Sequence, residues 1–290
     1  MKFRYSLIIF FMIFIFLGCA SHMTQIREVS DSDIPIKIIE LKNNLVENGV
    51  PGAWFDKQVK NKTFQLHANI GEYFQEAPEK QIVLNKKTKH FKKLSVNSKV
   101  NKGEIFIKKH RNIFNKAEAR HGIHKELIAA IIGIETNFAD HNYRGKFYAF
   151  NSLVSQYIFT NREDFAVREI TALYKLSCKT GHPPQYFKSS YAGAIGWGQF
   201  IPSSLLAYFV NKNGKNHVID PFSIEDTVFS IENYFYKHRL SKANINDDDS
   251  RYRAVFAYNH SDDYVEAVLS IYDQLRDYFS PTKKDGSEES

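Results

Sequence analysis

Residues 131–136 read IIGIET and end an almost wholly apolar run that begins at Leu127. The segment 125–138 contains no proline, and its apolar residues would cover most of a helix circumference, which is typical of a helix buried inside a domain. Glu135 would lie near the C-terminal end of that helix. Burial and the negative end of the helix dipole both disfavour an ionised carboxylate there, so we expect the pKa of Glu135 to be raised.

A carboxylic acid that stays protonated near neutral pH can donate a proton, as the general acid in glycosidic bond cleavage must. The alternative is a structural glutamate that pairs with a neighbouring lysine or caps backbone groups. This segment alone does not decide between the two interpretations, and the rest of the chain is needed.

A glycine-rich segment, residues 189–204, reads SSYAGAIGWGQFIPSS, and a helical pattern opens at Pro202. Its glycines permit positive φ and a close approach of other atoms to the backbone. Trp197, Gln199 and Ser190 would offer an apolar platform and hydrogen-bonding groups suited to a sugar. A phosphate-binding loop is the alternative, but the segment lacks the Gly-Lys-Ser/Thr ending and the dinucleotide-binding spacing.

A third motif, residues 257–261, reads AYNHS and is followed by Tyr264 and Val265. Taken alone, Tyr258 and Asn259 fit an ordinary helix end, because Asn commonly terminates helices and Tyr commonly buries part of its ring. The motif gains meaning from its position after the other two.

In this order and with these spacings, the three segments resemble the membrane-bound lytic murein transglycosylase B family, whose core is lysozyme-like. The resemblance covers about residues 34–279, and it is strongest over residues 121–136, 190–204, 220–234 and 257–265. It implies cleavage of the β-1,4 bond between MurNAc and GlcNAc in peptidoglycan. In this lyase reaction the MurNAc 6-hydroxyl attacks the anomeric carbon, and the product has a 1,6-anhydro-MurNAc end.

The resemblance assigns the family's single catalytic acid/base to Glu135. It also implies substrate contacts in the sugar cleft for Ser190, Gln199, Tyr258, Asn259 and Tyr264. Asp140 is a poor second carboxylate because it lies five positions after Glu135, whereas residues on one helix face are three or four apart. Two alternatives stay open, a hydrolytic muramidase and a catalytically inactive wall-binding lipoprotein.

The chain departs from the family pattern at several positions. Residues 137–139 read NFA where the family tends to have an aromatic residue and a glycine, and His90 occupies a family tyrosine position. Residues 211–215 read NKNGK where some members have an acidic calcium loop. Calcium prefers anionic oxygen ligands, so we expect none to bind there. The pair His121 and His124 lacks a zinc-binding context, and we predict no metal and no cofactor.

The N-terminus resembles an export signal of a bacterial lipoprotein. Lys2 and Arg4 precede an apolar run over residues 7–17, which is too short to span a membrane comfortably, and Gly18-Cys19 follows. We therefore expect a signal peptide over residues 1–18, acylation of Cys19 and a lipid-anchored linker over residues 19–33. Because Ala20 follows the cysteine, the resemblance favours a periplasm-facing lipoprotein of the outer membrane. An uncleaved anchor or a plain secreted protein is the alternative.

The predicted fold class is mainly α. Helical periodicity is expected over residues 31–48, 102–120, 125–138, 147–158, 164–179, 203–211, 224–238 and 262–278. A catalytic domain over residues 34–280 would consist of a lysozyme-like core, about 103–280, and a smaller N-terminal lobe. Residues 52–100 are hard to assign, 241–250 would form a short polar link, and 281–290 would be a disordered tail. Cys178 would be a small buried residue of its helix.

The chain carries a net charge of +7. Much of it is concentrated in Lys86, Lys87, Lys89, Lys92, Lys93, Lys99 and Lys102. A basic cluster indicates an anionic partner, such as the carboxylates of peptidoglycan stem peptides or lipid headgroups, although a solvated lysine-rich surface explains it equally well. The export signal argues against nucleic acid. Glycan strands and a membrane are the expected partners, and cell-wall synthesis proteins are further candidates.

Overall fold

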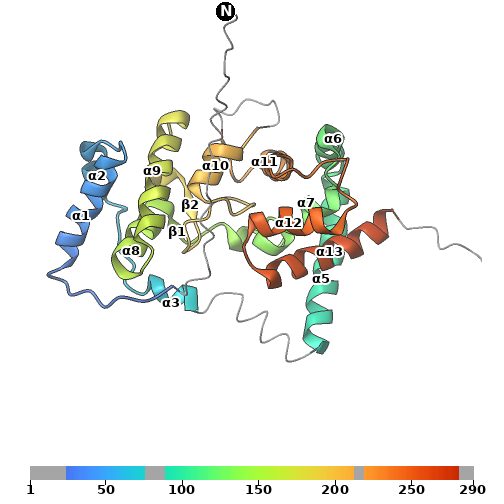
Figure 1. Ribbon diagram of the computed structural model, residues 1–290, viewed down its shortest axis with the longest axis horizontal. Helices are drawn as coiled ribbons and strands as arrows, with labels where there is room; N and C mark the ends of the chain where they lie inside the picture. The colour runs from blue at the N-terminus through green and yellow to red at the C-terminus, as the bar shows by residue number, and fades with distance from the viewer. Residues whose placement is uncertain (1–23, 76–88, 212–218, 281–290) are drawn as a thin grey trace, which may run out of the picture.

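The computed structural model describes residues 24–75, 89–211 and 219–280, with side chains omitted for residues 75 and 89–97. Almost all of its regular structure is helical, which confirms the mainly α prediction (Figure 1). The helices are α1 Ile34–Glu47, α2 Gly52–Val59, α3 Ile70–Gln75, α5 Lys89–Lys109, α6 Arg111–His121, α7 Lys125–Thr136, α8 Ala149–Phe159, α9 Glu163–Thr180, α10 Pro202–Tyr208, α11 Ile224–Lys237, α12 Asp248–Tyr258 and α13 Asp262–Phe279. Two 3-10 turns, η1 His141–Tyr143 and η2 Pro184–Tyr186, and a short antiparallel pair, β1 Phe147–Tyr148 with β2 Lys188–Ser189, complete it.

The N-terminal helices pack on the pair α8–α9 at one end of the molecule (Figure 1). Leu41 and Leu45 of α1 are fully buried against this pair. Helix α3 lies against α8, and α8 in turn contacts β1 and β2. Residues 52–75, which the sequence left unassigned, therefore contain two helices whose stability comes from packing rather than from their own periodicity.

Helix α7 lies in the middle of the other half, between α5, α6, α11 and α13. Eight of its twelve residues, from Glu126 to Gly133, are buried without interruption, as the apolar run predicts. The segment predicted as one helix over residues 102–120 is divided at His110, where α5 ends and α6 begins. The rings of Phe106 and Phe114 still pack together across this break, with centroids 5.8 Å apart.

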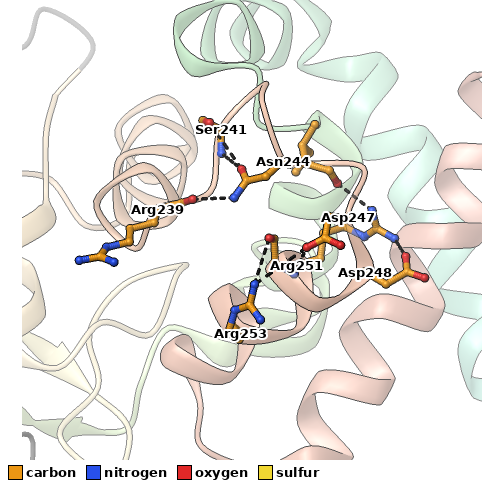
Figure 2. Close-up of polar contacts among 9 residues, drawn as sticks. Arg239, Ser241, Asn244, Asp247, Asp248, Arg251 and Arg253 are labelled. Carbon is orange, nitrogen blue, oxygen red and sulfur yellow. Dashed lines mark hydrogen bonds and ion pairs between the residues drawn. The ribbon is translucent and has the colours of Figure 1, made fainter.

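The connection from α11 to α12, predicted as a short polar link, contains a compact turn held by side-chain hydrogen bonds (Figure 2). Asn244 accepts a hydrogen bond from the Ser241 backbone and donates one to the Arg239 carbonyl, at 2.9 Å each. The side chain of Asp247 accepts from the Ser250 amide at 2.8 Å and starts α12. The polar stretch 241–250 therefore includes the first turn of a helix that its sequence did not predict.

Cys178 is exposed, so the prediction of a buried cysteine is wrong: it lies on the solvent side of α9, two positions from the buried Leu176.

Within the described residues, no helix has the length and apolar character needed to cross a membrane.

Candidate active site

Glu135 lies in the last turn of α7, and the chain reverses sharply after it. Residues 137, 138 and 139 all adopt positive φ, between 50° and 66°, although none of them is glycine. The reversal brings the Phe138 ring onto Gly133, where an added Cβ would lie 2.5 Å from a ring atom. Gly133 is thus needed because it leaves room for the turn that follows the candidate acid.

The side chain of Glu135 is half-buried and accepts a hydrogen bond of 2.6 Å from the hydroxyl of Tyr264 on α13. Burial raises the pKa of Glu135 from 4.5 to about 7, and the Tyr264 hydrogen bond, which favours the carboxylate, offsets part of the rise. The side chain therefore titrates near neutrality, as the apolar run predicts. It is held in place by a residue 129 positions away.

Thr136 joins the end of α7 to the glycine-rich segment. Its hydroxyl is fully buried and donates to the Trp197 carbonyl at 2.9 Å. It also accepts from the Ala139 amide at 3.3 Å, so one side chain fixes both the glycine-rich segment and the reversed turn relative to Glu135.

The glycines of this segment fit positions that other residues would not tolerate. Gly196 has φ of 80°, and a Cβ there would lie 2.3 Å from the Pro221 carbonyl oxygen. Gln199 also has positive φ, 49°, and its side-chain amide donates to the Gly196 carbonyl at 2.9 Å. Trp197 is only 3% exposed and donates its indole N–H to the Phe222 carbonyl, so its predicted role as a sugar platform is wrong.

Tyrosine hydroxyls from the C-terminal helices complete the surroundings of Glu135. Tyr258 donates to the Gly198 carbonyl at 2.6 Å, and Tyr234 donates to the Ala257 carbonyl at 2.6 Å. Burial, followed by the negative charge of Glu135, raises the pKa of both Tyr258 and Tyr264 well above its usual range. These hydroxyls therefore stay protonated around neutral pH and can donate hydrogen bonds there.

Comparison with known proteins places this site in a family. The model of the transglycosylase SLT domain matches residues 37–245. The chain belongs to this family. The lytic transglycosylase SltB1 of Pseudomonas aeruginosa has the same fold, with a TM-score of 0.67, 18% identity, and coverage of 84% of this chain and 99% of that chain. SltB3 of Pseudomonas aeruginosa, solved with NAG-anhNAM-pentapeptide, gives a TM-score of 0.65 at 17% identity, with coverage of 84% and 79%.

A curated relative is the membrane-bound lytic murein transglycosylase B of Escherichia coli, which is 30% identical over 148 residues. The match spans 51% of this chain and 40% of that protein's length. The Escherichia coli lytic transglycosylase Slt35, solved in complex with calcium, has a TM-score of 0.60 at 18% identity, with coverage of 82% and 92%. These likenesses confirm a lysozyme-like lytic transglycosylase fold.

The SLT domain brings some predicted residues together and leaves others apart. Tyr264 contacts Glu135 directly, and the side chains of Tyr258 and Gln199 each bond to a backbone carbonyl of the glycine-rich segment, at Gly198 and Gly196. Ser190 is half-buried, and its hydroxyl accepts from the Ala194 amide at 3.2 Å. Asn259 ends α12 and is exposed. Neither of these two has a hydrogen bond to Glu135 among the described residues.

Asp140 is directed to its own backbone. Its side chain accepts from the Asn142 amide at 3.0 Å and caps η1, and this hydrogen bond lowers its pKa. An ionised carboxylate in that turn is a structural cap.

Lys99 is a residue near the SLT site that the sequence did not single out. Its ammonium group, half-buried on α5, donates to the Gly133 carbonyl at 2.7 Å, and burial lowers its pKa. Nothing in the sequence distinguishes this position from the other lysines of the lysine-rich stretch. Only the packing of α5 on α7 reveals that it points inward.

The two histidines of the 121–124 pair have separate partners. His121 bonds to the buried Glu232 and stacks on Tyr236, whereas His124 bonds to the Tyr272 hydroxyl at 2.8 Å. Among the described residues, no three His, Cys, Asp or Glu side chains are grouped as metal ligands. Cys19, the His90 side chain and residues 212–218, which include most of the predicted calcium-free loop, lie outside the described residues.

Proposed function

We propose that this SLT domain cleaves the MurNAc–GlcNAc β-1,4 bond of peptidoglycan without water, with Glu135 as its single acid/base. The observation that supports this most directly is the position of Glu135, whose pKa burial raises to about 7 and whose carboxyl group is held by the Tyr264 hydroxyl. Such a group is protonated in a large fraction of molecules at neutral pH, so it can donate a proton to a leaving oxygen.

The first step uses the proton of Glu135. It passes to the glycosidic oxygen while the bond from that oxygen to MurNAc C1 breaks, and positive charge develops on the sugar ring. The carboxylate that remains lies beside that charge, and the hydrogen bond from Tyr264 helps to stabilise it.

The second step returns the proton. The MurNAc 6-hydroxyl oxygen bonds to C1, its proton passes to Glu135, and the product is a 1,6-anhydro ring. Water is not consumed, and a second carboxylate is not needed to activate it, which fits the engagement of Asp140 as a backbone cap.

We assign substrate positioning to Ser190, Gln199, Tyr258, Asn259 and Tyr264. Gln199 belongs to the glycine-rich segment that Thr136 joins to Glu135, and Tyr258 of α12 donates to the Gly198 carbonyl of that segment, so sugar groups bound there would be fixed relative to the acid. A hydrogen-bonded geometry of this kind would orient the 6-hydroxyl toward C1.

The N-terminal pattern extends the proposal to a location. Acylation of Cys19 would anchor the enzyme to a membrane facing the periplasm, and the outer membrane is favoured by Ala20. The curated relative described above is itself membrane-bound, which supports this assignment. Mass analysis of the mature N-terminal peptide would detect the acyl chains, and an unmodified Cys19 would overturn the anchor without affecting the activity.

The test of the activity is mass spectrometry of the soluble products released from purified sacculi by the chain lacking its first 19 residues. Wild type should release anhydro-muropeptides and the Glu135→Gln variant should release none, while Glu47→Gln, an exposed carboxylate at the end of α1, serves as the matched control. Products with reducing MurNAc ends would identify a muramidase. Sacculus binding without products from any form would identify a wall-binding protein.

A further inference from the structure

An aromatic group outside the assigned site lies where α3 meets the β1–β2 pair. We call it the aromatic ledge, and its members are His67, Tyr73, Phe147 and Tyr191. Tyr73 stacks on Tyr191 with ring centroids 5.6 Å apart and 18° between their planes, and its edge meets Phe147 at 5.6 Å. The His67 ring meets Phe147 edge-on at 4.8 Å.

The ledge is open to solvent. Tyr73 is 37% exposed, and the other three rings are half-buried. Burial lowers the pKa of His67, so its imidazole is neutral at pH 7 and offers one donor and one acceptor. His67 is held on α8 by its backbone amide, which donates to the Ser155 hydroxyl at 3.0 Å. Among the described residues, no hydrogen bond involves its ring nitrogens.

The ledge is continuous with the glycine-rich segment. Tyr191 directly follows Ser190, and Phe147 pairs with Ser189 across the β1–β2 pair. Further along the same segment, the Gly198 carbonyl accepts a hydrogen bond from Tyr258, which lies near Glu135. Figure 1 shows α3 below the β1–β2 pair. The glycine-rich segment therefore connects the surroundings of the candidate acid to the ledge.

From this arrangement we propose that the aromatic ledge is a remote subsite that binds a pyranose ring of the glycan strand. The axial C–H bonds of a pyranose carry partial positive charge and pack on the negative face of an aromatic ring. A neutral imidazole beside the rings provides hydrogen bonds to hydroxyl groups without selecting for charge. The four ledge side chains are uncharged at pH 7, and Arg162 reaches the ledge only through the Phe74 ring that packs on Tyr191, so the rings themselves favour a neutral sugar over the charged peptide stem.

This subsite rests on the proposed function, because it assumes that the strand lies along the glycine-rich segment. Its effect depends on strand length. A short substrate that occupies only the positions around Glu135 does not reach the ledge, whereas a long strand gains an additional contact. The ledge therefore makes the enzyme prefer long glycan strands.

The test measures binding in the Glu135→Gln background, with peptide-free glycan as the probe in two lengths, a tetrasaccharide and a strand of about twelve sugars. Tyr73→Leu keeps apolar packing under α3 but removes the flat ring. It should weaken binding of the long strand about five- to tenfold and leave the tetrasaccharide unchanged. Tyr73→Phe should bind like the parent. The matched control is Tyr236→Leu, which removes a 42% exposed tyrosine that also stacks on a ring, His121.

Equal losses for both glycan lengths, no loss for either length, or the same loss in the Tyr236→Leu control would overturn the subsite. Thermal unfolding of each variant identifies a fall in binding that is caused by loss of folded protein. The failure of the proposed function has a different signature. If the chain with Glu135 intact releases no anhydro-products but Tyr73→Leu still weakens only the long strand, the ledge is a glycan-binding site of a protein with another activity.

Discussion

The raised pKa of Glu135 predicts that removing its charge stabilises the protein at alkaline pH. Below pH 4.5 the carboxyl is protonated in both the folded and the unfolded chain, so it contributes no pH dependence. Between pH 4.5 and about 7 only the folded state keeps the proton, and the free energy of unfolding falls as the pH rises. Above pH 7 this loss is complete. Glu135→Gln removes the titration and keeps the shape of the side chain.

The size of the effect follows from the shift. A rise from 4.5 to about 7 corresponds to about 3 kcal/mol of destabilisation at pH 8.5. The side chain is partly exposed, so solvent screening reduces this to about 2 kcal/mol. For a domain of this size, that is roughly 4–8 °C in Tm. Glu135→Gln should therefore melt higher than wild type at pH 8.5 by about this amount and at the same temperature at pH 4.

Differential scanning calorimetry at both pH values measures the difference, and Glu47→Gln corrects for the general effect of removing one negative charge. If Glu135→Gln lowered the Tm at pH 8.5, the hydrogen bond from Tyr264 would outweigh burial, and the carboxylate would be the favoured form. The same shift at pH 4 and pH 8.5 would mean that the effect comes from packing and not from titration. Either result would refute the conclusion that burial raises the pKa of Glu135.

Three other predictions concern the site and its frame. Tyr264→Phe removes the hydrogen bond that favours the carboxylate, so the alkaline fall in kcat/KM, expected near pH 7 in wild type, should move to higher pH; a pH–rate profile with an unmoved limb would contradict it. Gly133→Ala places a Cβ 2.5 Å from the Phe138 ring and should cost about 2 kcal/mol in urea unfolding, and an unchanged midpoint would contradict the steric argument. Arg239 has a φ of 67°, which glycine adopts without strain, and its side chain points away from its neighbours (Figure 2), so Arg239→Gly should raise the free energy of unfolding by about 1 kcal/mol. Arg253→Gly inside α12 should lower it by about 1 kcal/mol, because glycine is a poor helix former. A change of the same sign for both variants would refute the argument from backbone conformation.

The features that sequence predicts well are those encoded locally. The apolar run before Glu135 specifies a buried helix by itself, and burial is the cause of the raised pKa. The glycines at 193 and 196 adopt positive φ as their spacing suggested, and Pro202 starts α10. Each of these follows from steric rules that act within a few residues.

The features that sequence misses depend on which segments meet in space. Lys99 and Lys102 look alike in the sequence, but the packing of α5 on α7 turns the first toward a backbone carbonyl and leaves the second exposed. Trp197 looked like a sugar platform because tryptophan often is one, yet the return of the chain at Phe222 buries its ring. Helix α12 was missed because its exposed Asp, Arg and Tyr residues hide a narrow apolar face made by Ala254 and Val255.

The acidity of the candidate site is itself a long-range property. The matched region of the SLT family ends at residue 245, whereas Tyr258 and Tyr264 belong to α12 and α13 beyond it. Helix α13 packs along α7 and is one of the elements that remove water from Glu135. Without α13 the carboxyl would regain solvent and lose its Tyr264 partner, and its pKa would return toward 4.5, where it is ionised at pH 7 and cannot donate a proton. The residue that would perform the chemistry is therefore encoded in one segment, and the property that would enable it is created by another segment more than a hundred residues later.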